Sequence, residues 1–168
     1  MRTFLIFASI IAVTWAYQHW FNDEEVIRVN GGVARVIDGD SFKVGEEEFR
    51  IYGVDAPEYR QMCKDEDGAD WACGKTSRTG LDRILRNQDH NCTVHARDRF
   101  GRNVVLCTSE TGQDLSAVLV TSGLALSAQH FDEIIYANDE GKAQKAKRGI
   151  WRGEFMRPDA WRAQNPRN

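Results

Sequence analysis

The fold is decided by residues 31–58, which read GGVARVIDGDSFKVGEEEFRIYGVDAPE. Within this stretch the alternating run VARVI and the run FKV lie on either side of an Asp-Gly pair. An Asp-Gly pair between two such runs is a strong short-range signal for a β-hairpin. A third run, EFRIYGV, ends just before Pro57, which cannot donate a ladder hydrogen bond. The stretch therefore predicts a three-stranded antiparallel meander.

A second hairpin and three helices are expected after the meander. Cys92–Arg97 and Asn103–Cys107 flank the turn sequence DRFGR, and the spacing of Leu81, Ile84 and Leu85 predicts a helix before this hairpin. Two further helices are expected around 115–119 and from about 133 to 148. Five short strands in a three-plus-two order, with a helix between the third and the fourth, match an α+β fold. The specific prediction is a five-stranded OB-type Greek-key β-barrel with three α-helices.

Length and charge limit the classes of protein to consider. The chain has 168 residues, which allows one globular domain and leaves little room for a second. It carries 22 Lys and Arg against 25 Asp and Glu, a net charge of −3. This balance excludes a protein that coats nucleic acid through overall positive charge. An anionic substrate would have to be bound by a local cluster of cations.

The N-terminal 22 residues are distinct from the rest. Residues 3–22 contain no Asp, Glu, Lys or Arg, while Arg2 precedes them and three acidic residues follow. This pattern predicts that residues 1–22 are either a signal peptide or an N-terminal signal anchor. In the second alternative, residues 3–22 would hold the protein in a membrane. Both alternatives place the domain outside the cytoplasm, because the charge asymmetry favours a cytoplasmic N-terminus. The protein is expected to be secreted, periplasmic or membrane-anchored.

Four cysteines fit an exported domain. An even number of cysteines in such a chain suggests two disulfides in one of three connectivities. Zinc is disfavoured because the cysteines are not paired at the short spacing of zinc sites. A hairpin centred on Arg99-Phe100 would place Cys92 directly opposite Cys107. Cys63 would then pair with Cys73.

Acidic and basic residues are predicted to meet at one end of the meander. Its first turn carries Asp38 and Asp40, and the third strand returns to that end before Asp55. Asp40 and Asp55, with backbone carbonyls and water, offer the oxygen ligands that Ca²⁺ prefers. Arg50, together with Arg102 from the second hairpin, could bind phosphate oxygens through its planar guanidinium. Taken singly, the Asp-Gly-Asp turn is more often a solvated hairpin tip. Taken together, these groups are what phosphodiester hydrolysis requires.

Four segments resemble the motifs of the staphylococcal nuclease (thermonuclease) family. They are DGDS at 38–41, RIYGVDAPE at 50–58, DRFGR at 98–102 and EGKAQKAKRGIW at 140–151. The resemblance covers about residues 31–152, which we take as the nuclease domain. It implies an OB barrel with three helices and Ca²⁺-dependent endo- and exonuclease cleavage of DNA and RNA with little sequence specificity. By the same resemblance the functional residues are the calcium ligands Asp40, Asp55 and the carbonyl of Ala56, the phosphate-binding Arg50 and Arg102, and the general base Glu58.

Two other functions are alternatives to a nuclease. A non-catalytic nucleic-acid-binding module would have no need to keep the acids and arginines together. An oligosaccharide-binding OB domain would need aromatic residues on the barrel face, where only Phe49 and Tyr52 are candidates. The nuclease is expected to be a monomer acting on single-stranded or frayed duplex substrate. Loop 59–74 has no predicted role, and the tail 153–168 is expected to be a disordered end unless its arginines hold nucleic acid.

Overall fold

The computed structural model describes residues 25–130 and 133–166. The predicted signal peptide or anchor at residues 1–22 lies outside the described residues. Within the described ranges, no helix has the length and apolar character needed to cross a membrane.

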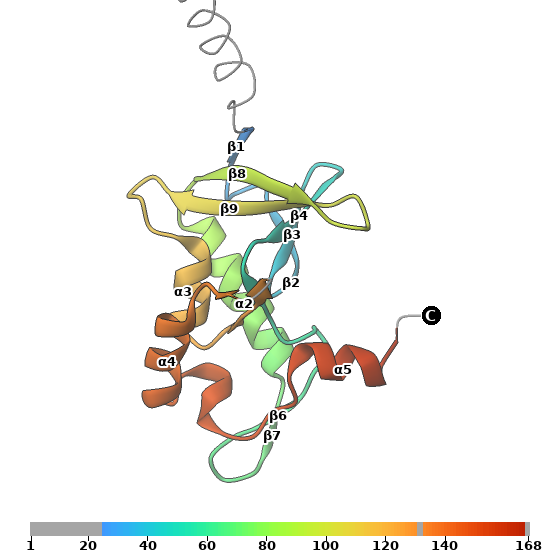
Figure 1. Ribbon diagram of the computed structural model, residues 1–168, viewed down its shortest axis with the longest axis vertical. Coiled ribbons are helices and arrows are strands. Elements are labelled where there is room, and N and C mark those ends of the chain that lie inside the picture. Colours follow the sequence, from blue (N-terminus) through green and yellow to red (C-terminus); the bar gives the residue numbers. More distant parts are fainter. Residues whose placement is uncertain (1–24, 131–132, 167–168) are drawn as a thin grey trace, which may run out of the picture.

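The main sheet has six strands in the order β1-β8-β9-β4-β3-β2, and the sheet is curled rather than flat (Figure 1). All neighbouring strands are antiparallel except β4 and β9, which run parallel. This topology confirms the predicted α+β, OB-type fold. The strands are β1 (Val26–Val29), β2 (Arg35–Asp38), β3 (Ser41–Val44), β4 (Glu47–Ile51), β8 (His90–Arg97) and β9 (Asn103–Ser109).

The first strand was not among the five expected. The short run VIRV of β1 pairs with β8, and only Val29 of its four residues is buried. Three small two-stranded sheets complete the β structure: β5 with β10, β6 with β7, and β11 with β12. Their strands are β5 (Val54–Asp55), β6 (Cys63–Lys64), β7 (Asp70–Trp71), β10 (Leu126–Ser127), β11 (Gln129–His130) and β12 (Glu133–Ile134).

The described residues form four α-helices and one 3-10 helix, and α3 and α4 lie side by side (Figure 1). They are α2 (Cys73–Arg86), α3 (Leu115–Thr121), α4 (Ala137–Lys145), η1 (Gly149–Arg152) and α5 (Pro158–Gln164). Two expectations are corrected. The last predicted helix begins at Ala137 rather than near Glu133, because buried Tyr136 is anchored outside the helix by donating its hydroxyl proton to Asp114 at 2.8 Å. The tail, expected to be disordered, forms α5.

The hydrophobic core lies between the curled sheet and the helices. Phe42 and Phe49 stack with ring centroids 5.3 Å apart, and both are almost fully buried beside Leu81 and Leu85 of α2. Burial removes Phe49 as a stacking platform for a sugar, which weakens the alternative of an oligosaccharide-binding domain. A second, smaller cluster lies around the Cys63–Cys73 disulfide, with Leu126 and the 3-10 helix.

The disulfides are Cys63–Cys73 and Cys92–Cys107, the two pairs that the sequence predicts. The hairpin that carries Cys92 and Cys107 differs from the expected one in the position of its turn. The β8–β9 turn is centred on Phe100 rather than between Arg99 and Phe100, since Arg97 pairs with Asn103. A register shift between Val94 and Ala96 then brings Cys92 opposite Cys107. A β-bulge therefore restores the register that the simple count assumed.

Candidate active site

Three residues from separate strands and turns meet where the sequence placed the candidate site. Asp40 lies in the turn between β2 and β3, Arg50 lies on β4 opposite Ser41, and Asp55 is the last residue of β5. The Arg50 Nη2 atom is 3.1 Å from Asp40 Oδ2 and 3.1 Å from Asp55 Oδ1. The return of the third strand to the first turn thus joins two carboxylates through one guanidinium.

Asp40 is the most buried acid of this group, with a relative exposure of 3%. Burial raises its pKa above the usual 3.8, while the charge of Arg50 and a hydrogen bond from the Ala56 amide at 3.1 Å oppose the shift. A buried carboxylate is costly unless it is paired and hydrogen-bonded. The charged form of Asp40 therefore depends on nearby cations.

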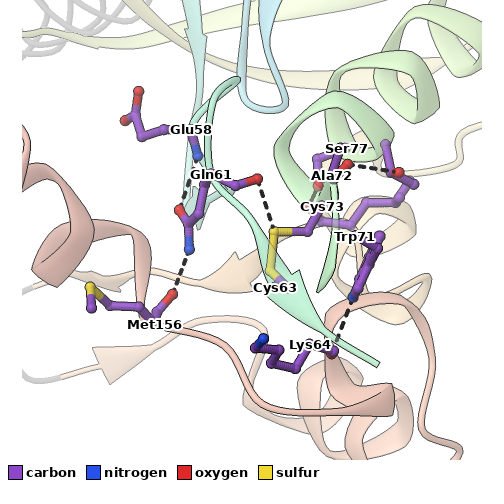
Figure 2. The surroundings of a disulfide bond; sticks show 11 residues. Glu58, Gln61, Cys63, Lys64, Trp71, Ala72, Cys73, Ser77 and Met156 are labelled. Carbon is purple, nitrogen blue, oxygen red and sulfur yellow. Dashed lines mark hydrogen bonds between the residues drawn. A yellow bond between two sulfur atoms is a disulfide. The ribbon is translucent and has the colours of Figure 1, made fainter. Parts of the chain in front are cut away.

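Glu58 lies beside this cluster, on the segment that follows β5. Its amide donates to the side chain of Gln61 at 3.2 Å, and Gln61 in turn reaches the tail (Figure 2). Gly74, in the first turn of α2, packs directly against the Glu58 backbone. A Cβ atom at Gly74 would come 1.8 Å from the Glu58 carbonyl oxygen. Close packing thus fixes the backbone that carries this carboxylate.

The β8–β9 hairpin presents Arg102 to the same region. Asp98 organises the turn by accepting hydrogen bonds from the amides of Phe100 and Arg102 and from Arg102 Nε at 2.7 Å. Partial desolvation acts to raise the pKa of Asp98, but these hydrogen bonds prevail and lower it. Arg102 also lies 3.4 Å from Glu48. Phe100 projects at the tip, 70% exposed, with the Arg102 guanidinium over its ring.

These groups surround a cleft of about 620 Å³. The cleft brings together four residues predicted for the site, namely Asp40, Arg50, Glu58 and Arg102. Asp55 adjoins it through Arg50, and Ala56 is buried next to Asp40. The lining includes three residues that the sequence did not place there: Trp161 and Arg162 of α5, and Asn165, which directly follows the helix.

Arg162 makes the closest contacts of the tail with the site. Its Nη1 and Nη2 atoms lie 2.8 and 3.1 Å from the two carboxylate oxygens of Asp55, and Nη1 is 3.1 Å from Glu58 Oε1. Partial burial disfavours the charge of Arg162, but the hydrogen bonds and charges of both carboxylates raise its pKa. The Pro-Asp start of α5 is a local signal for a helix. No local signal indicates that the helix packs against residues about a hundred positions earlier.

The donor set suits a hard divalent cation with several bound waters. The candidate ligands Asp40, Asp55 and the Ala56 carbonyl all offer oxygen atoms. Among residues 25–130 and 133–166, no group of three or more His, Cys, Asp and Glu side chains is arranged to hold a metal ion. Asp40, Asp55 and the Ala56 carbonyl are the neighbouring oxygen donors that could hold such a cation, with water completing a flexible coordination shell. The burial of Asp40 and its contact with Arg50 are the observations that favour positive charge here.

Comparisons with known proteins identify the class. A family model described as staphylococcal nuclease homologue matches residues 48–153. The chain is 39% identical over 124 residues to the succinoglycan biosynthesis protein ExoI of Rhizobium meliloti (strain 1021), covering 73% of this chain and 65% of that protein. It is 26% identical over 140 residues to an uncharacterized endonuclease of Escherichia coli O157:H7, covering 80% of this chain and 85% of that protein. The chain therefore belongs to the staphylococcal nuclease homologue family. It spans slightly less than two thirds of the rhizobial protein, and α5 lies beyond the residues that the family model matches.

Proposed function

We propose that this protein is an exported, Ca²⁺-dependent nuclease that hydrolyses phosphodiester bonds of DNA and RNA. The single observation that carries the proposal is the convergence of Asp40, Arg50, Asp55 and Glu58 beside one open cleft. Family membership and the endonuclease relative support it. The two disulfides support an oxidising compartment, in agreement with export.

The roles follow from charge and position. Asp40, Asp55 and the Ala56 carbonyl would hold Ca²⁺, which when bound stabilises negative charge on the phosphate. Glu58 would accept the proton of the attacking water as a general base. The two aspartates and Glu58 therefore have separate tasks, and the burial of Asp40 suits a metal ligand better than a proton acceptor.

The arginines would bind the phosphate group. Arg50 and Arg102 both line the cleft, and their planar guanidinium groups match phosphate oxygens. Contacts to phosphate position a nucleic acid but carry no base information. Exposed Phe100 offers a surface on which any base can stack. These features support little sequence specificity and a preference for single-stranded or frayed duplex substrate. We further expect the enzyme to act as a monomer.

The experiment incubates the purified full chain with plasmid DNA and with RNA, in EGTA, in Ca²⁺ and in Mg²⁺. We expect cleavage of both substrates in Ca²⁺, none in EGTA, and weaker activity in Mg²⁺, because Mg²⁺ demands tighter octahedral geometry. Undiminished cleavage in EGTA would refute the metal assignment. Binding of nucleic acid without cleavage would instead support a non-catalytic binding module.

A second experiment tests the general base. Glu58→Gln should lower turnover by about 10²–10⁴-fold while the half-saturating Ca²⁺ concentration stays near that of the wild type. Glu46→Gln is the matched control, since Glu46 is exposed and does not line the cleft. Full rescue of Glu58→Gln by added Ca²⁺ would show that Glu58 binds the metal rather than activating water.

A further inference from the structure

The disulfide-closed loop 59–74 and the tail beyond the family domain are packed together beside the active site. The buried side chain of Gln61 donates to the Met156 carbonyl at 2.6 Å (Figure 2). The Lys64 amide donates to the Glu154 carbonyl at 2.7 Å. Gly153 fits so closely that a Cβ atom there would lie 2.3 Å from the Lys64 carbonyl oxygen. The loop thus serves as a platform for the tail.

Helix α5 continues from this platform to the cleft. Pro158 at its start is buried, and one helix turn later Trp161 and Arg162 line the cleft. The Arg162 guanidinium binds both oxygens of Asp55 and one oxygen of Glu58 at 2.8–3.1 Å. Its target is therefore the pair of carboxylates assigned to metal binding and to proton transfer, although the tail lies outside the matched family domain.

We propose that Arg162 is a metal-competing residue of the active site. Its guanidinium and the divalent cation bind the same oxygens of Asp55 in turn, so that α5 sets the Ca²⁺ concentration at which the site loads. This inference rests on the calcium site of the proposed function. Asp55 accepts two hydrogen bonds from Arg162 and one from Arg50, which together occupy three of the about four lone-pair sites of its carboxylate. Ca²⁺ held by both oxygens of Asp55 must therefore displace a guanidinium, and the cations also repel each other.

The competition has a measurable consequence. The cation must displace the Arg162 contacts, so their free energy is subtracted from the free energy of Ca²⁺ binding. Arg162 is 38% exposed, which limits the strength of its contacts. We expect Arg162→Ala to bind Ca²⁺ roughly tenfold more tightly than the wild type.

The test measures Ca²⁺ binding directly, by isothermal titration calorimetry on the full chain stripped with EGTA. Arg162→Lys keeps the charge but loses the two-pronged geometry, and its affinity should fall between the other two. Arg157→Ala is the matched control, because it removes the same charge from the same tail. Arg157 has a side-chain contact with Asp159 at 3.8 Å and does not line the cleft. Its Ca²⁺ affinity should equal that of the wild type.

The outcomes separate this inference from the proposed function. Unchanged or weaker Ca²⁺ binding by Arg162→Ala and Arg162→Lys would overturn the competition. A rise in KM for DNA with no change in Ca²⁺ affinity would also overturn it, because that result identifies Arg162 as a substrate-binding arginine. Tighter binding by Arg162→Ala without nuclease activity in any variant would uphold the competition and overturn the nuclease. If no variant binds Ca²⁺, the competition and the metal assignment both fail.

Discussion

Removing Arg50 should destabilise the protein chiefly by leaving the buried Asp40 carboxylate without its cation. Deleting one partner of a buried ion pair costs about 3–5 kcal/mol. Arg50 is 26% exposed, and the Ala56 amide still donates to Asp40 in the variant. We therefore expect Arg50→Ala to lower the free energy of unfolding by about 2–3 kcal/mol in EGTA.

Bound Ca²⁺ and a lower pH should each reduce this loss of unfolding free energy. Bound Ca²⁺ would compensate the Asp40 charge in place of Arg50, so the loss in saturating Ca²⁺ should shrink to about 1 kcal/mol. Burial already raises the pKa of Asp40, and removal of Arg50 raises it further. The penalty falls on the charged form, so it is present at high pH and diminishes as the pH falls and Asp40 becomes protonated.

The measurement is urea denaturation followed by tryptophan fluorescence, in EGTA and in Ca²⁺, at pH 8 and at pH 5. Arg28→Ala is the control, because the Arg28 side chain is 68% exposed and its ion pairs lie at the surface. Its effect should stay within about 0.5 kcal/mol under all conditions. A loss for Arg50→Ala below about 0.5 kcal/mol, or one that ignores both Ca²⁺ and pH, would refute the account of Asp40 as a buried charge in need of a cation.

Three further predictions concern the Cys63–Cys73 disulfide, Gly74 and the buried His90 of β8. Replacing Cys63 and Cys73 by serine should loosen the platform of the tail, so calorimetry should show tighter Ca²⁺ binding, the same direction as removal of the α5 arginine. Gly74→Val should displace the Glu58 backbone and lower turnover at least about tenfold, while Ca²⁺ affinity is unchanged. Burial lowers the pKa of His90 below 6.5, so the free energy of unfolding should fall as the pH drops from 6.5 toward 5, by at most about 1.4 kcal/mol per pH unit. Denaturation of His90→Phe should lack that slope, and an unchanged slope would contradict this assignment.

The predictable part of the site is the part whose geometry is local. Asp40 and Arg50 lie on one meander, where strand alternation and the Asp-Gly turn determine which residues face each other. The Cys92–Cys107 pair follows from the register of a single hairpin in the same way, and there a bulge compensated for the misplaced turn centre. Short-range pairing rules suffice wherever both partners belong to one hairpin or to adjacent ones.

The missed elements depend on contacts distant in sequence. Strand β1 is only four residues long and joins the sheet by pairing with β8, more than sixty residues away. Helix α5 has seven residues, a length that is marginal for an isolated helix in water. Its position therefore depends on two sets of distant contacts: residues 154 and 156 are bound by loop 59–74, and Arg162 binds Asp55 and Glu58. The local sequence PDAWRAQ gives no indication of those contacts. The expectation of a disordered tail was reasonable for the segment alone and wrong for the folded chain.

The balance of charges in the cleft explains why Arg162, which was not predicted for the site, is found there. Asp40, Asp55 and Glu58 are all largely buried, whereas Arg102 is already engaged by Asp98 and Glu48. Arg50 alone cannot compensate three carboxylates, so the acids require a further cation. A metal ion and an arginine from elsewhere in the chain both meet that electrostatic requirement. The structure thus shows a need for positive charge, which Arg162 of the docked tail helps to supply. In the competition proposed above, Arg162 is the group that Ca²⁺ would displace.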